Sequence, residues 1–164
     1  MMSATTIKAI TLWQPWATFM AIGAKKFETR SWRTDYRGPI AIHAAQRPMR
    51  AAELNTMPHL VEKGQNADWF FFPMGQVVAI GLLKQVYSVE TAIRHGHATV
   101  QELHLGDWSA GRFAWHIDPI WKLAQPVPVR GRQRLWDWQL PDSLAEEYAE
   151  WREVVVRRII EGVA

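Results

Sequence analysis

Three charged residues near the N-terminus, Lys25, Glu28 and Arg30, are close enough in the sequence to act on one ligand. If residues 26–32 form a strand, Glu28 and Arg30 point to the same face, and Lys25 lies where the strand begins. A carboxylate between two cations stays ionised, because opposite charges favour the charged form. Arginine offers a planar fork of donors to a phosphate or a base edge. The spacing predicts a site for an anionic, planar ligand, with an ordinary exposed strand of paired charges as the alternative.

Tryptophans flank these charges: Trp13 and Trp16 precede them, and Trp32 follows. A half-exposed ring beside a cation suits a stacked base. The chain has 164 residues and ten tryptophans. So many large rings are hard to bury completely in a small domain, so we expect two or more to line a surface groove. Stacking would lose its physical basis if all three rings pointed into the core.

The turn after this segment mixes aromatic and positively charged side chains; its residues include Ser31, Trp32, Arg33, Tyr36, Arg37 and Gly38. This composition is expected where bases stack and phosphates are neutralised. A basic surface loop after a core strand is the alternative.

A second turn, "GDWSAGRFAW", contains Gly106 and Gly111, which permit positive φ, so that backbone amides could face an anion. Ser109 and Arg112 could add donors. The alternative is a tight turn capped by Asp107.

A third segment, "PVRGRQRLW", has arginines at alternate positions, Arg130, Arg132 and Arg134, which could form a basic stripe. An edge strand protected by its charge is the alternative. The candidate nucleic-acid-binding residues are therefore Trp13, Gln14, Trp16, Lys25, Arg30, Ser31, Trp32, Tyr36, Arg37, Arg112, Arg130 and Arg132.

Metal and cofactor chemistry has little support in the sequence. His95, His97 and His104 have no carboxylate cluster with metal-ligand spacing beside them, and the chain has no cysteine. Phosphate-binding, dinucleotide-binding and common hydrolase motifs are absent. We expect no metal and no cofactor. The candidate catalytic residues are Lys25, Glu28 and Arg30, together with Ser109 and His43, although His43 also suits a strand histidine with satisfied hydrogen bonds.

The formal net charge is +3 and the sequence pI is near 9.4, which permits a nucleic-acid partner without requiring one. The N-terminus does not resemble a secretory signal, and no stretch approaches the length of a transmembrane helix. We expect a cytoplasmic protein with no membrane partner, and a single domain over residues 1–164.

The elements that must position these residues follow from hydrophobic periodicity and turn signals. Strands with tight turns and few long crossovers favour a mixed or antiparallel sheet, and a small closed or partly closed barrel would remove its exposed edges. The predicted strands are 7–13, 26–32, 39–45, 76–89, 112–117, 120–131 and 134–140; the predicted helices are one ended by Gly23, one over 46–58, weak ones over 89–105 and an amphipathic one over 142–161; residues 58–75 are an irregular excursion.

The segment "LWQPWATFMAIGAKKFETRSW" closely resembles the signature of the ASCH domain family. That signature centres on G-x-K-x-x-E-x-R, which Gly23, Lys25, Glu28 and Arg30 match. "YRGPIAIHAA", "GRFAW" and "PVPVRGRQRLW" are also similar to family members. The resemblance covers roughly residues 7–140, so residues 141–164 would be an appended helix. It implies an α+β fold, a small PUA-like mixed β-barrel flanked by short helices, with a cleft beside the first helix.

The resemblance also implies RNA or nucleic-acid binding, and RNA cleavage for some members. One bacterial branch looks like an amidohydrolase of N4-acylated cytidine, which uses a Lys, a Thr and a later Glu. Lys25 matches the Lys, but Glu28 stands at the Thr position. We therefore expect a module that binds single-stranded RNA or a modified nucleotide. The alternatives are an RNA-processing hydrolase that uses Lys25 and Glu28, as a ribonuclease or an amidohydrolase, and a protein-interaction module, which would fit wholly buried tryptophans.

Overall fold

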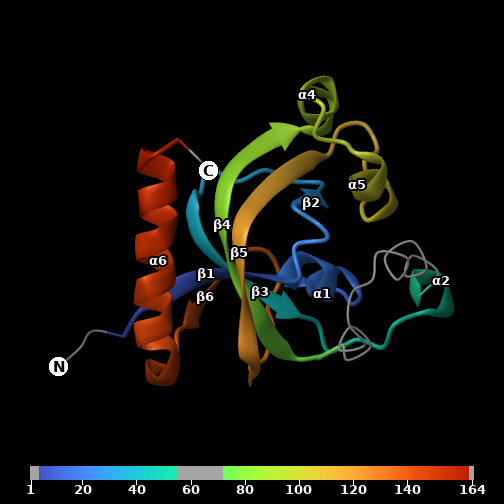
Figure 1. Cartoon of the computed structure of the whole chain (residues 1–164). Helices are drawn as coiled ribbons and strands as arrows, with labels where there is room; N and C mark the ends of the chain where they lie inside the picture. The colour runs from blue at the N-terminus through green and yellow to red at the C-terminus, as the bar shows by residue number, and fades with distance from the viewer. Residues whose placement is uncertain (1–3, 55–71, 163–164) are drawn as a thin grey trace, which may run out of the picture.

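The sheet at the centre of the fold has six strands in the order β2-β5-β4-β3-β1-β6 (Figure 1). The computed structural model describes residues 4–54 and 72–162. β1 and β3 run parallel to each other, and the other neighbouring strands run antiparallel. The strands are β1 (Thr6–Leu12), β2 (Phe27–Arg30), β3 (Gly38–Ala44), β4 (Gln76–Ser88), β5 (Phe113–Pro128) and β6 (Trp136–Gln139).

The helices lie around this sheet, with α6 along one face and α1 on the other side (Figure 1). α4 and α5 connect β4 to β5. No helix within the described residues is long and apolar enough to span a membrane. The helices are α1 (Trp16–Ala21), α2 (Ala51–Leu54), α4 (Val89–Arg94), α5 (Val100–His104), the 3-10 helix η2 (Asp142–Leu144) and α6 (Ala145–Ile160).

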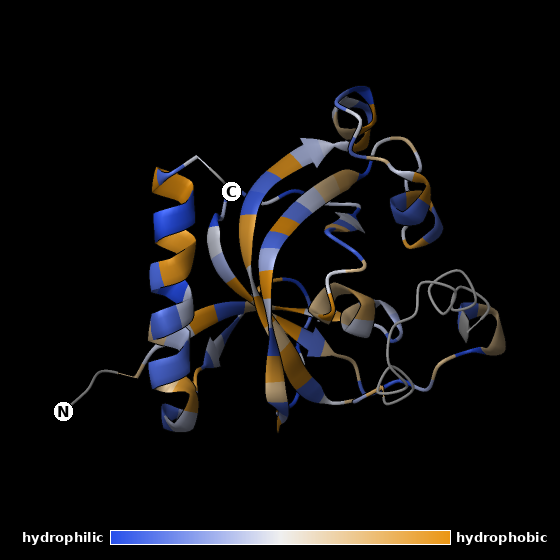
Figure 2. Cartoon of the chain, in the orientation of Figure 1, coloured by the Kyte–Doolittle hydropathy of each residue, from blue (hydrophilic) through white to orange (hydrophobic). Residues whose placement is uncertain are grey.

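Side-chain alternation along the strands produces a separate apolar cluster on each face of the sheet. On β3, Ile40 and Ile42 pack with Met20 of α1, whereas Ala41 packs in the cluster that contains Tyr148 of α6. Figure 2 shows the corresponding bands of apolar and polar residues along β4 and β5. α6 therefore covers the face of the sheet that lies away from α1.

The predicted α+β class with a mixed sheet is confirmed. Barrel closure is not seen within the described residues, because β2 and β6 each pair with a single strand there. β2 has only four residues and pairs with the start of β5. Register shifts between β4 and β5 mark bulges, which bend the two long strands (Figure 1).

Several element boundaries differ from those predicted. Residues 112–131 contain one long strand, β5, where two were expected. The helix predicted over 46–58 appears as α2 only, because residues 55–71 lie outside the described residues, as does most of the predicted excursion over 58–75. The predicted end of the first helix is confirmed, since Gly23 follows α1 with a φ of 76°.

Candidate functional site

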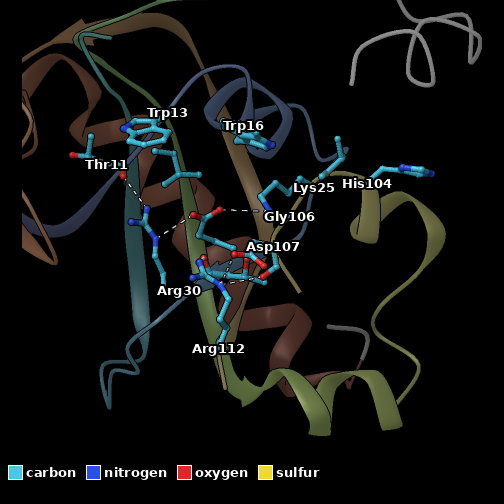
Figure 3. A pocket seen from close by; sticks show the side chains of 13 residues that line it. Thr11, Trp13, Trp16, Lys25, Arg30, His104, Gly106, Asp107 and Arg112 are labelled. Atoms are coloured by element: carbon cyan, nitrogen blue, oxygen red, sulfur yellow. Dashed lines mark hydrogen bonds and ion pairs between the residues drawn. The ribbon is translucent and has the colours of Figure 1, made fainter. Parts of the chain in front are cut away.

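A cavity of about 500 Å³ lies where α1, β2 and the segment after α5 meet the end of β1 (Figure 3). We call it the motif cavity, because it contains the three charged residues singled out from the sequence. Its lining residues are Thr11, Leu12, Trp13, Trp16, Lys25, Glu28, Thr29, Arg30, His104, Leu105, Gly106, Asp107 and Arg112.

Lys25 is the buried cation of the motif cavity, with 1% of its surface exposed. The chain turns after α1, and the Lys25 amide donates to the carbonyl of Phe19 at 3.1 Å. The ammonium donates to the carbonyl of Phe27 and lies 3.5 Å from Oε2 of Glu28. Burial of a charge is costly unless a counter-charge and hydrogen bonds accompany it. Glu28 and the Phe27 carbonyl supply both.

Glu28 and Arg30 lie on the same face of β2, as strand alternation predicts, while Phe27 and Thr29 are buried on the other face. Nε of Arg30 is 3.1 Å from Oε1 of Glu28. Nη2 of Arg30 donates to the carbonyl of Thr11 at 2.8 Å, which ties β2 to the end of β1. Glu28 therefore contacts a cation with each of its two oxygens.

Arg112 is the second arginine of the motif cavity, and backbone carbonyls hold it in the same way. Its Nη2 donates to the carbonyl of Thr29 at 2.9 Å, and its Nε donates to that of Asp107 at 3.1 Å. Nε also lies 3.5 Å from the carboxylate of Asp107. The lining thus has three cations and two carboxylates among these groups, a formal charge of +1, which favours an anionic ligand.

The tryptophans lie on one side of the charged groups in Figure 3. Trp13 is 52% exposed. The protein-interaction alternative would fit tryptophans that are wholly buried, and Trp13 is not. The guanidinium carbon of Arg47 lies 3.9 Å from the Trp13 ring centroid and covers one face of the ring. Arg47 is itself held by Glu53, at 2.7 and 3.1 Å. Trp16 is partly buried against Phe19 and its neighbours.

Glu102 of α5 is a buried carboxylate that the sequence did not reveal. Its Oε1 accepts from the Lys26 amide at 2.7 Å, and its Oε2 has no hydrogen-bond partner within the described residues. Burial raises the pKa of Glu102, and the backbone hydrogen bond from Lys26 and the charge of Lys25 oppose that rise. When ionised, this carboxylate is a further negative charge that interacts with Lys25.

Four of the predicted binding residues have structural partners outside the motif cavity. Gln14 is fully buried, where its side chain bonds to the backbone of Pro73 and Thr18. Trp32 packs edge-to-face on Trp115, with centroids 4.7 Å apart. Tyr36 donates to the Pro39 carbonyl at 2.5 Å. Arg37 donates to the carbonyls of Thr34 and Tyr36 and to the side chain of Gln85. Ser31, which was also predicted to bind, is exposed.

The turn before β5 is capped as the alternative interpretation predicted. Ser109 is exposed and bonds to the carboxylate of Asp107, and these hydrogen bonds lower the pKa of Asp107. Gly111 has a φ of 81°, but its amide donates to Glu90 at 2.9 Å and does not face the cavity. Gly106 has no positive φ; a Cβ there would lie 3.3 Å from Nζ of Lys25. Gly106 thus gives Lys25 room.

His43, Arg130 and Arg132 line a second cavity, of about 720 Å³, which we call the loop cavity. His43 lies on β3, which pairs with β1 and β4, whereas the charged strand β2 pairs with β5, so His43 is not on a strand next to Glu28 and Arg30. Nε2 of His43 donates to the carbonyl of Val129 at 2.9 Å, and burial lowers the pKa of the imidazole. The predicted basic stripe is interrupted at Arg134, which has a φ of 57°.

Metal ligation has no candidate cluster in residues 4–54 and 72–162: no group of three or more His, Cys, Asp or Glu side chains there could hold an ion.

Comparison with known proteins gives a family and a fold. A family model described as the ASCH domain matches residues 10–162, which includes α6. No curated protein matches. Among solved structures, that of ASCH from Zymomonas mobilis is similar, with a TM-score of 0.50 at 14% identity over 87% of this chain and 93% of that chain. A mutant form from the same organism has a TM-score of 0.49 at 15% identity, over 88% and 94%.

Proposed function

The chain belongs to the ASCH domain family, and we propose that it binds single-stranded RNA by taking one unpaired nucleotide into the motif cavity. The observation that carries the proposal is an exposed indole, Trp13, in the same cavity as two arginines whose guanidinium groups are already fixed. An unpaired nucleotide has the two parts that such a site would bind, a stacking base and an anionic phosphate.

The two arginines supply the phosphate contacts. Arg30 and Arg112 are oriented by the carbonyls of Thr11, Thr29 and Asp107. In the described part of the chain, Nη1 of each has no hydrogen-bond partner, so each can donate to a phosphate oxygen. Because their geometry is set before the ligand arrives, little side-chain entropy is lost on binding.

Trp13 supplies the stacking surface. Arg47 covers one face of the indole, so a base would stack on the other face. Such stacking contributes about 1–3 kcal/mol per base and accepts every base type. Glu28 is assigned a holding role in this proposal, since its oxygens already contact Lys25 and Arg30.

Fluorescence anisotropy with a labelled single-stranded RNA tests the proposal. We expect Trp13→Ala to weaken binding about tenfold, and Trp13→Phe, which keeps a stacking ring, to restore most of the affinity. We also expect affinity to fall steeply as salt is raised. Equal binding by the wild type and Trp13→Ala, or affinity that does not change with salt, would contradict the proposal.

One observation favours RNA cleavage as a second candidate function: the buried Lys25 ammonium and the Glu28 carboxylate face the same cavity 3.5 Å apart. Glu28 would take the proton from a ribose 2′-hydroxyl while the 2′-oxygen attacks the adjacent phosphorus. Lys25 would stabilise the charge that develops and give a proton to the leaving 5′-oxygen. The products would be a 2′,3′-cyclic phosphate and a 5′-hydroxyl. RNA fragments with these ends, formed by the wild type and not by Lys25→Gln, would establish cleavage; intact RNA would exclude it.

A further inference from the structure

Thr11 lies between the motif cavity and the loop cavity and lines both of them. Its carbonyl accepts from Nη2 of Arg30 at 2.8 Å, as Figure 3 shows. Its hydroxyl donates to the carbonyl of Arg132 at 3.0 Å. The two cavities therefore adjoin across one residue, and a ligand longer than one nucleotide could extend from one into the other.

The loop cavity differs from the motif cavity in its charge. Arg130 and Arg132 line it with the amides Gln46 and Gln133, and no carboxylate is among its lining residues. Both arginines are exposed, and neither forms an ion pair with another described residue. Two cations without a counter-charge in a concave surface favour an anion.

The loop that carries these arginines is held firmly against the sheet. His43 donates to the Val129 carbonyl at 2.9 Å. Gly131 lies directly on the imidazole: a Cβ there would be 2.4 Å from Cε1 of His43 and 2.9 Å from the Thr11 hydroxyl. Only a residue without a side chain allows this approach. Since Gly131 is fixed, the backbone positions of Arg130 and Arg132 on either side of it are fixed as well.

We propose that the loop cavity binds a phosphate group next to the nucleotide in the motif cavity, through Arg130 and Arg132, so that the site spans at least two nucleotides of one strand. This inference rests on the proposed function. His43 and Gly131 act as positioning residues in it, because they contact the loop and not the phosphate.

The test uses the full chain and a fluorescent oligouridylate of about eight nucleotides, titrated between about 50 and 200 mM salt. The variants are Arg130→Gln/Arg132→Gln, Trp13→Ala and a control that removes two positive charges elsewhere, Arg94→Gln/Arg158→Gln. Both control residues are exposed, on α4 and α6. We expect the loop variant to weaken binding about tenfold at low salt and to lower the salt slope by about 0.7 for each lost phosphate contact. The control should bind almost as the wild type does.

The outcomes separate the two proposals. If the loop variant binds like the control while Trp13→Ala binds weakly, the second subsite is wrong and the motif cavity stands. If Trp13→Ala binds like the wild type, the nucleotide does not stack on Trp13 in the motif cavity. The inference is then wrong as well, because it requires a nucleotide in that cavity. If the wild type binds no RNA, the proposed function and the inference both fail.

Discussion

At the scale of single residues, Glu28 determines the arrangement of the motif cavity. One of its oxygens lies 3.5 Å from the buried ammonium of Lys25, and the other lies 3.1 Å from Arg30. Both distances are short, and Glu28 and Lys25 are largely removed from water. A carboxylate in this position holds two cations in fixed positions, and a binding site needs its charges fixed in this way. An isolated ion pair on the surface does not hold its side chains so firmly.

This role predicts the effect of Glu28→Gln on stability. The substitution leaves the Lys25 ammonium buried without its close counter-charge, so we expect the free energy of unfolding to fall by about 3 kcal/mol. Glu153→Gln removes the carboxylate of an exposed ion pair with Arg157 and should change the free energy of unfolding by less than about 0.5 kcal/mol. Urea denaturation of the two variants measures the difference. Equal stability of both variants would show that Glu28 is not needed to hold Lys25.

At the scale of elements, α5 is short, and it positions one end of the motif cavity. Its last residue, His104, lines the cavity, as do Leu105, Gly106 and Asp107, which follow it. Its N-terminus is capped by Thr99, whose hydroxyl accepts from the Glu102 amide at 3.2 Å. A helix of this length has little stability of its own, so its cap and its packing decide whether it is populated.

We therefore expect Thr99→Ala to lower the free energy of unfolding by about 1 kcal/mol, and Thr99→Ser to change it by only a few tenths. Loss of the cap should act locally first. The Leu105 amide, which donates to Gln101 at 3.1 Å, should exchange its hydrogen about fivefold faster in Thr99→Ala. Hydrogen-exchange NMR measures this rate. An unchanged rate at Leu105 would mean that packing alone holds α5.

At the scale of the whole molecule, buried titratable groups link stability to pH. Burial, with the charge of Lys84, lowers the pKa of His116 to about 4 from its ordinary value of 6.5. The imidazole stacks on Phe27, with centroids 4.5 Å apart. Between these two pKa values the unfolded chain binds a proton that the folded chain does not, so His116 makes stability fall as the pH is lowered from about 6.5 to about 4. The raised pKa of Glu102 acts in the opposite sense, because the folded chain then binds the additional proton.

The variant His116→Phe isolates this contribution. It keeps a ring to stack on Phe27 and removes the titration, so the loss of stability between about pH 6.5 and 4 should become smaller. His95→Gln, at an exposed position, serves as the control and should keep the wild-type dependence. Urea midpoints measured across this pH range provide the comparison. A pH dependence that is identical in the wild type and His116→Phe would assign it to other groups.

The sequence by itself determined the local features of the site and the family. Alternation along residues 26–32 predicts that Glu28 and Arg30 share a face, and Gly23 predicts the end of α1. These features depend on neighbours within a few residues, which is why spacing reveals them. The α+β class follows in the same way from the order of strand and helix signals.

Only the tertiary structure decided which residues meet. Trp13 and Trp16 line the motif cavity while Trp32 packs on Trp115, although all three flank the same motif. Arg130 and Arg132 line a separate cavity that shares Thr11 with the first. Strand partners are chosen by the burial of whole faces across distant parts of the chain, as when β2 pairs with β5 and β1 with β3. No local spacing contains that information, because the energy of each pairing depends on the packed core and not on the segment itself.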